Sequence, residues 1–188
     1  RLEGYGCKTM GLHTLSSCVL TAEMLRLPGE EGRKIDLGLV GKVTEVNAKL
    51  LQTLCADGTI PVISSTAMDK NGGKLNVNAD TAAGMVAAAV VAEKLVMVSD
   101  THGIRRDMND PDSRISSLNR AQIKEMIDAG IITDAMFPKV EACLIALEAG
   151  VKKSHIIDGR IAHSLLLEIY TAKGIGTEII RDRSPLQT

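Results

Sequence analysis

Aromatic residues are almost missing from this sequence. Its 188 residues include one Phe, two Tyr and no Trp, which removes the usual platforms on which nucleic-acid bases stack. The formal net charge of -1 gives no electrostatic reason to expect nucleic acid either. We therefore expect no nucleic-acid partner.

Cysteine and histidine are few, and neither set has the spacing of a metal site. The cysteines are Cys7, Cys18, Cys55 and Cys143, and the histidines are His13, His102, His155 and His163. Scattered cysteines without a C-x-x-C pair are typical of reduced thiols in the cytoplasm. We expect a cytoplasmic protein with no metal site built from its own side chains.

Long hydrophobic runs are lacking as well. No apolar run reaches the length that spans a membrane, and the N-terminus does not resemble a signal peptide. We therefore expect no membrane partner. Because the sequence opens on Arg1, we also expect that a segment upstream has been removed.

The sequence does contain a regular alternation of strand and helix patterns. The alanine-rich residues 81–93 predict a helix, and the apolar run KLVMVS at residues 94–99 predicts a buried strand. A capping-box pattern at Asn119 and Gln122 predicts the start of the next helix. Upstream, Asn47 is placed to cap a helix over residues 48–56.

The same alternation continues to the C-terminus. Pro138 predicts the start of a helix that Gly150 ends. Further patterns predict a strand at residues 154–157, a helix at 161–173 and a strand at 177–180. This order predicts an α/β sandwich with a largely parallel sheet.

The first half is less regular. Residues 60–65 and 74–78 are strand-like and flank the turn sequence DKNGG, so they predict a β-hairpin. Residues 1–40 contain scattered leucines and glycines and predict no complete layer of structure.

A row of polar side chains lies between this turn and the alanine-rich helix. In an extended strand Asn76, Asn78 and Asp80 point to one side, which predicts a polar ligand or a hydrogen-bond network there. Capping of the following helix explains Asp80 equally well. Asn76 is also explained as a group that satisfies the end of a hairpin.

Lys139 is predicted in the first turn of a helix, where the helix dipole disfavours a cation. A bound anion would reverse that preference, and a lysine beside exposed helix amides is a common phosphoryl site. The alternative is a lysine that extends into water. Residues 99–103 follow a buried strand, at the sheet edge where α/β proteins bind ligands, although a plain turn also fits.

Five segments together carry a family resemblance. They are DLGLVG at residues 36–41, IPVISS at 60–65, NVNADTAA at 76–83, IITDAMFPKVEA at 131–142, and HIIDGRIAHSLLLEIYTAKGIGTEI at 155–179. In order and spacing the sequence resembles the N-acetylglutamate kinases of the amino-acid kinase family. The resemblance implies a three-layer αβα sandwich with a mostly parallel central sheet, in which residues 1–80 belong to the amino-acid-substrate domain and residues 81–188 form the nucleotide-binding domain.

The activity implied is ATP-dependent phosphorylation of the side-chain carboxylate of N-acetyl-L-glutamate to an acyl phosphate, in arginine biosynthesis. Asn76 would then hold the substrate, Asp80 would orient the catalytic lysines, and Lys139 would stabilise the transferred phosphoryl group. Mg²⁺ would be held chiefly by the phosphates of ATP. The nucleotide would contact Ser99, Asp100, Thr101, His102, Gly103, Ile104 and Met136.

The C-terminal segment resembles the arginine-inhibited members of this family. His155, Glu168 and Gly174 match their effector site, and a carboxylate such as that of Glu168 accepts two parallel hydrogen bonds from a guanidinium. A solvent-facing helix glutamate is the alternative. The resemblance also implies a homo-oligomer, either a dimer or a hexamer.

The sequence also departs from the family. The N-terminal strand with a catalytic lysine, the glycine-rich loop and the substrate-binding arginine are not visible, so we expect an incomplete substrate domain. Ala135 replaces a glycine, and its methyl group is expected to crowd a backbone that approaches phosphate. The alternatives are a catalytically silent nucleotide- or arginine-binding remnant, including a regulatory subunit, and a different carboxylate or carbamate kinase.

Overall fold

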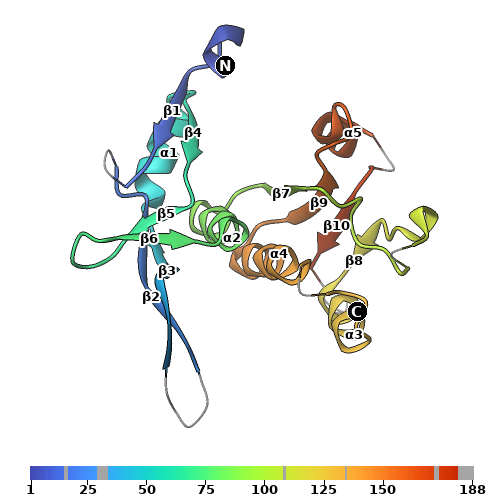
Figure 1. The fold of residues 1–188 in the computed structure, drawn as a ribbon. Helices are drawn as coiled ribbons and strands as arrows, with labels where there is room; N and C mark the ends of the chain where they lie inside the picture. Colours follow the sequence, from blue (N-terminus) through green and yellow to red (C-terminus); the bar gives the residue numbers. More distant parts are fainter. Residues whose placement is uncertain (15–16, 29–33, 108, 134, 172–173, 182–188) are drawn as a thin grey trace, which may run out of the picture. The chain divides into compact units, whose positions relative to one another are not determined.

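The computed structural model describes residues 1–14, 17–28, 34–107, 109–133, 135–171 and 174–181 (Figure 1). The chain divides into two compact units, Arg1–Val90 and Val91–Thr188. This division falls one helix later than the functional division predicted at residue 80, which stays a prediction. No helix within these described ranges is long and apolar enough to cross a membrane.

Unit 1 contains two β-structures. Strands β1 (Thr9–Leu12) and β4 (Ile60–Ile63) form a parallel pair. Strands β2 (Leu20–Pro28), β3 (Lys34–Val46), β5 (Thr66–Met68) and β6 (Lys74–Val77) close into a small barrel in the order β2-β3-β6-β5. Leu20, Leu51 and Leu75 are fully buried in the core of this unit.

The two α-helices of unit 1 are those predicted. Helix α1 (Ala48–Ala56) begins after Asn47, whose side chain accepts a hydrogen bond from the Leu50 N–H. Helix α2 (Ala79–Val90) follows β6, and a short 3-10 helix, η1 (Leu2–Tyr5), lies near the N-terminus. The alanine-rich pattern therefore predicted α2 correctly, with its start two residues too late.

Two predictions for unit 1 are wrong. Residues 60–65 and 74–78 were predicted to pair as a hairpin. Instead β4 pairs with β1, and β6 pairs antiparallel with the shorter strand β5. The residues called irregular also include β1, β2 and much of β3. The pairing of β2 with β3 contains two register shifts, and such bulges break the alternation by which a strand is recognised in sequence.

Unit 2 is a four-stranded sheet with helices on both faces. Its strands are β7 (Lys94–Ser99), β9 (Lys153–Asp158), β10 (Thr177–Ile180) and β8 (Ser117–Leu118), in the order β7-β9-β10-β8. The β7–β9 and β10–β8 pairs are parallel, and β9–β10 is antiparallel. The predicted α/β fold with a largely parallel sheet is thus confirmed.

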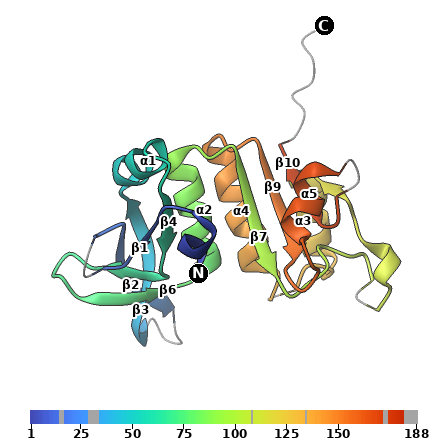
Figure 2. The same ribbon diagram turned by 90° about the horizontal axis from the view of Figure 1, so that it is seen from above.

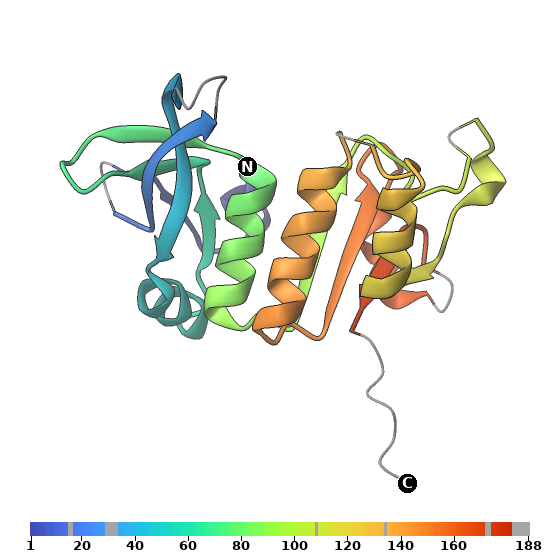
Figure 3. The ribbon, with the colours of Figure 1, turned by 90° about the horizontal axis from the view of Figure 1, so that it is seen from below.

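The helices of unit 2 are α3 (Arg120–Asp128), α4 (Phe137–Ala149) and α5 (Ser164–Tyr170), with a 3-10 helix η3 (Pro111–Ser113). Helix α4 lies on one face of the sheet and α5 on the other (Figures 2 and 3). Helix α5 is shorter than the predicted 161–173, since it starts after His163, which has a positive φ of 59°. Residues 172 and 173 of that prediction lie outside the described residues.

The capping box of α3 gives a first testable prediction. The Asn119 side chain accepts a hydrogen bond from the Gln122 N–H, and the Gln122 side chain accepts one from the Asn119 N–H, both at 2.9 Å. Asn119→Ala leaves the Gln122 N–H without this acceptor, so we expect it to lower the free energy of unfolding by about 1 kcal/mol. Urea unfolding measures the change.

The control for this substitution is Asn109→Ala, in an exposed loop of the same unit. We expect the control to change stability by less than about 0.5 kcal/mol. Equal losses for the two variants would show that the capping box does not stabilise α3.

Candidate active site

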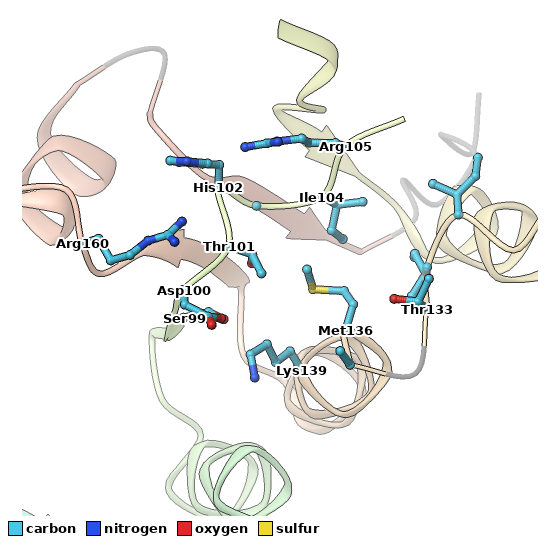
Figure 4. Close-up of a pocket in the computed structure, with 14 residues that line it drawn as sticks. Ser99, Asp100, Thr101, His102, Ile104, Arg105, Thr133, Met136, Lys139 and Arg160 are labelled. Atoms are coloured by element: carbon cyan, nitrogen blue, oxygen red, sulfur yellow. The ribbon is translucent and has the colours of Figure 1, made fainter. Parts of the chain in front are cut away.

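A pocket of about 480 Å³ lies at the C-terminal end of β7 in unit 2. It collects side chains from the loop after β7, the start of α4 and the turn after β9 (Figure 4). The eight residues predicted to contact nucleotide or phosphoryl group from this unit all line it: Ser99, Asp100, Thr101, His102, Gly103, Ile104, Met136 and Lys139. The volume is in the range that small ligands and cofactors occupy.

The sheet places this pocket. Strands β7 and β9 are parallel and end in register, with Ser99 opposite Asp158. The Gly159 N–H donates to the Ser99 carbonyl at 2.8 Å, so the turns that leave the two strands are joined directly. Carboxyl ends of parallel strands are the edge where open α/β sheets bind ligands.

A hydrogen bond to Thr177 holds the loop after β7 in place. The Ile104 N–H donates to Thr177 Oγ1 at 2.8 Å. Gly103 has a φ of +81°, and a Cβ there would lie 2.6 Å from the same Oγ1. Only glycine fits this position. The backbone of the loop that lines the pocket is therefore fixed at Gly103 and Ile104.

Lys139 lies in the first turn of α4, as predicted. The accompanying prediction of exposed helix amides is wrong for the N–H groups around the helix start. The N–H groups of Met136 and Phe137 donate to the Thr133 carbonyl, and that of Lys139 donates to Met136, while Pro138 has no N–H. These N–H groups are therefore already hydrogen-bonded within the chain.

The pocket has an apolar and a charged side. Ile104 and Met136 lie toward Thr133, whereas Arg160, Asp100 and Lys139 lie on the other side (Figure 4). Ile132 and Ala135 also line the pocket. The Oγ1 atom of Thr101 is buried and makes no hydrogen bond within the part of the chain that the structure describes, as expected for a group that a ligand satisfies.

The structure adds residues that the sequence patterns did not single out. Arg105, Thr133 and Arg160 line the pocket, and Asp158 lies directly behind it. The DGR sequence that contains Asp158 and Arg160 was part of the family resemblance, but it was assigned no role. An acidic residue at the end of a predicted buried strand was the available signal.

Asp158 is fully buried and contacts two side chains, those of His102 and Arg160. Its Oδ2 lies 2.8 Å from Nδ1 of His102 and 2.7 Å from Nη2 of Arg160. Its Oδ1 accepts hydrogen bonds from the Arg160 N–H at 2.9 Å and from Nε at 3.0 Å. These hydrogen bonds from Arg160 outweigh the effect of burial and lower the pKa of Asp158 from 3.8 to about 2.

This lowered pKa predicts how acid affects stability. A carboxyl whose pKa is lower in the folded than in the unfolded chain stabilises the fold above pH 3.8, and that contribution is lost as the pH falls toward 2. We expect Asp158→Asn to lose less stability than the wild type between pH 4 and pH 2. Urea unfolding at several pH values measures the two slopes, and equal slopes would contradict the assignment.

In unit 1 the predicted polar row is only partly present. Asn76 and Asn78 are exposed while Leu75 and Val77 are buried, as the alternation predicted. Asp80 is not on the strand but in the first turn of α2. Asn78 is the residue that caps this helix, because its Oδ1 accepts from the Thr81 N–H at 2.9 Å. The alternative in which Asp80 caps this helix is therefore wrong.

A second pocket of about 390 Å³ in unit 2 brings together the three predicted effector residues, His155, Glu168 and Gly174. Glu168 is buried, 8% exposed, so the alternative of a solvent-facing glutamate is wrong. Its Oε1 lies 2.7 Å from His155 Nδ1, and its Oε2 accepts from the N–H groups of Ile175 and Gly176 at 2.7 and 2.8 Å. Burial alone would raise the pKa of Glu168, but these hydrogen bonds outweigh it and lower the pKa.

His155 completes this pocket. It is 6% exposed, and its Nε2 is buried without a hydrogen bond to any residue in the described ranges. Lys94, Lys153 and Glu178 supply further charged groups to the lining. A buried ring nitrogen without a partner is uncommon and is expected where a ligand or water binds.

Sequence comparisons agree with this geometry. Residues 1–158 match the Amino acid kinase family. The acetylglutamate kinase of Methanocaldococcus jannaschii is 45% identical over 186 residues, which are 97% of this chain and 62% of that protein. The acetylglutamate kinase of Nostoc sp. is 48% identical over 155 residues, 82% of this chain and 51% of that protein. The chain thus spans about three fifths or less of the length of these curated relatives.

Solved structures show the same fold. N-acetylglutamate synthase from Neisseria gonorrhoeae, complexed with coenzyme A and N-acetyl-glutamate, matches with a TM-score of 0.82 at 23% identity, over 97% of this chain and 40% of that one. Giardia carbamate kinase matches with a TM-score of 0.67 at 17% identity, over 96% of this chain and 65% of that one. At these identities the likeness concerns the fold alone, and it confirms the predicted fold class. By its sequence match and its fold, the chain belongs to the amino acid kinase family.

Proposed function

We propose that the chain catalyses, or forms part of the enzyme that catalyses, ATP-dependent phosphorylation of the side-chain carboxylate of N-acetyl-L-glutamate, a step of arginine biosynthesis. The observation that carries this proposal is the 45% identity with an acetylglutamate kinase over 97% of the chain. The product would be an acyl phosphate. Transfer of this kind depends mainly on positioning and on stabilisation of charge.

The pocket after β7 supports ATP as the phosphoryl donor. Its apolar side, with Ile104 and Met136, suits a base, and its charged side, with Lys139, suits phosphates. The unpartnered hydroxyl of Thr101 would be satisfied by a polar group of the nucleotide. Lys139 would stabilise the charge that develops on the transferred group.

The roles of Asn76 and Asp80 are carried over from the family resemblance. Asn76 is exposed on β6 and would bind the amino-acid substrate. Asp80, in the first turn of α2, would orient the catalytic lysines. Both belong to unit 1, whereas Lys139 belongs to unit 2.

A magnesium ion would accompany ATP. The described residues contain no group of three His, Cys, Asp or Glu side chains able to hold a metal, and Asp100 is the one carboxylate among the described pocket residues. Phosphate oxygens would therefore supply most of the ligands, which is the usual arrangement for Mg²⁺ in phosphoryl transfer.

A coupled assay of ADP release with N-acetylglutamate as acceptor tests the proposal. We expect turnover that depends on the acceptor, with glutamate and carbamate as comparison acceptors. Faster turnover with carbamate than with N-acetylglutamate would show that carbamate, and not N-acetylglutamate, is the substrate. Binding of ATP in calorimetry without turnover on any acceptor would favour the catalytically silent alternative.

We further propose that arginine inhibits this activity by binding in the pocket of His155, Glu168 and Gly174. A guanidinium would supply hydrogen bonds to the carboxylate of Glu168, and the buried Nε2 of His155 would gain a partner. We expect Glu168→Gln to weaken arginine binding at least tenfold in calorimetry, because the buried charge is lost. The control is Glu125→Gln on an exposed position of α3, and equal affinities for the two variants would contradict the site.

The remaining expectations complete the proposal. Cys7, Cys18, Cys55 and Cys143, all within the described ranges, form no disulfide, which supports a reducing, cytoplasmic setting. A homo-oligomer, either a dimer or a hexamer, is implied by the family resemblance. Sedimentation velocity with and without arginine would measure the assembly.

A further inference from the structure

Arg160 is held in one orientation by a buried carboxylate. Its guanidinium donates from Nε and Nη2 to the two oxygens of Asp158, at 3.0 and 2.7 Å. The Asp158 side chain is 0% exposed, while that of Arg160 is 61% exposed. An exposed arginine ordinarily samples many rotamers, but a two-point pair with a fixed carboxylate removes most of that freedom.

The rest of the guanidinium is available to a ligand. Asp158 is the only hydrogen-bonding partner that the Arg160 side chain has in the described structure. Its Nη1 makes no hydrogen bond there. In Figure 4 the side chain extends from the end of β9 toward the loop that carries Thr101 and His102, and Arg160 lines the pocket itself.

The charges around the pocket indicate the chemistry of the ligand. Among the described lining residues, Arg105, Lys139 and Arg160 are cationic, and Asp100 is the one carboxylate. An excess of positive charge around a concave site raises the local concentration of anions. A planar guanidinium matches two phosphate oxygens at once.

We propose that Arg160 binds a phosphate group of the nucleotide, and that Asp158 is the positioning residue that orients its guanidinium. The inference rests on the proposed function in one respect, that the ligand of this pocket is a nucleotide. Asp158 also lies 2.8 Å from His102, so one buried carboxylate fixes side chains from both loops that form this wall. Arg160 therefore approaches the ligand from β9, while Lys139 approaches it from α4.

Calorimetry with ATP, ADP and adenosine tests the contact. We expect Arg160→Met to weaken ATP and ADP binding about tenfold and to change adenosine binding less than twofold, because adenosine has no phosphate. Arg160→Lys keeps the charge but cannot form the two-point pair, so we expect it to recover part of the ATP affinity. Arg106→Met is the control, since Arg106 is an exposed arginine of the same unit that does not line the pocket.

A double-mutant cycle tests the positioning role. Asp158→Asn should weaken ATP binding more in the wild-type background than once Arg160 is methionine, because part of its action passes through that side chain and the rest through His102. Circular dichroism checks that each variant is folded. Additive losses would overturn the positioning role, and equal losses for ATP and adenosine would overturn the phosphate contact.

The outcomes also separate this inference from the proposed function. ATP binding that depends on Arg160, together with no transfer to N-acetylglutamate, would retain the inference and overturn the function. Turnover and ATP affinity that are both unaffected by Arg160→Met would retain the proposed function and overturn the phosphate contact of Arg160. A wild-type chain that binds no ATP would overturn both.

Discussion

Lys139→Ala is expected to lower the rate of phosphoryl transfer to N-acetylglutamate by a factor of about 10²–10³. Lys139 lines the pocket on its charged side, and the N–H groups around the start of α4 are bonded within the chain. The lysine side chain is therefore the group from α4 that can stabilise charge on the transferred phosphoryl group. Loss of one such group in a preorganised site has an effect of this size.

Kinetic constants separate this role from simple binding. We expect kcat to fall much more than the KM for ATP rises, because the interaction strengthens as the transition state forms. Lys124→Ala, on an exposed position of α3, is the control and should retain wild-type rates. A Lys139→Ala variant with an unchanged kcat would remove Lys139 from the catalytic step.

The elements that sequence predicted well are those with local signals. Asn119 and Gln122 form their capping box within four residues of each other, and Gly150 ends α4 in a left-handed conformation. Strand β7 coincides with the apolar run at residues 94–99. For the capping box and the helix end the decisive contacts join neighbours in the sequence, whereas β7 is recognised from its composition although its partner β9 is distant.

One error lies where the partner is distant, and another lies in local backbone geometry. β4 pairs with β1, although the nearby turn at residues 69–73 favoured a hairpin with β6. Capping of α2 was one of two interpretations of Asp80, but Asn78 is two residues earlier and bonds to the Thr81 N–H. Packing decides that the short strand β5 pairs with β6. Backbone geometry decides that Asn78, and not Asp80, caps α2.

The candidate sites show the same division. The order of motifs predicted some of the residues that line the two pockets of unit 2, including Lys139 and Glu168. It did not predict that Asp158 holds both His102 and Arg160, because those residues come from loops after two different strands. The parallel register of β7 and β9 brings them together, and register is not visible in either strand alone.

Gly176→Ala is expected to destabilise unit 2 by about 3 kcal/mol. A Cβ at this position would lie 2.3 Å from the Ile156 carbonyl oxygen and 2.7 Å from Ile157 Cγ2. Both isoleucines are fully buried in β9, so neither can move aside, and overpacking of a filled core costs about 1–3 kcal/mol. The Gly176 N–H also donates to Glu168, and a shift of the chain would weaken that bond.

Hydrogen exchange and urea unfolding together locate the effect. We expect faster exchange of the β9 and β10 amides in Gly176→Ala and a lower unfolding midpoint, with weaker arginine binding because Glu168 loses a donor. Gly11→Ala is the control, since an added Cβ there meets nothing within 4 Å, and it should change stability by less than about 0.5 kcal/mol. Wild-type protection of β9 in the Gly176 variant, with an unchanged unfolding midpoint, would show that the chain accommodates a Cβ at this position, and would contradict the prediction.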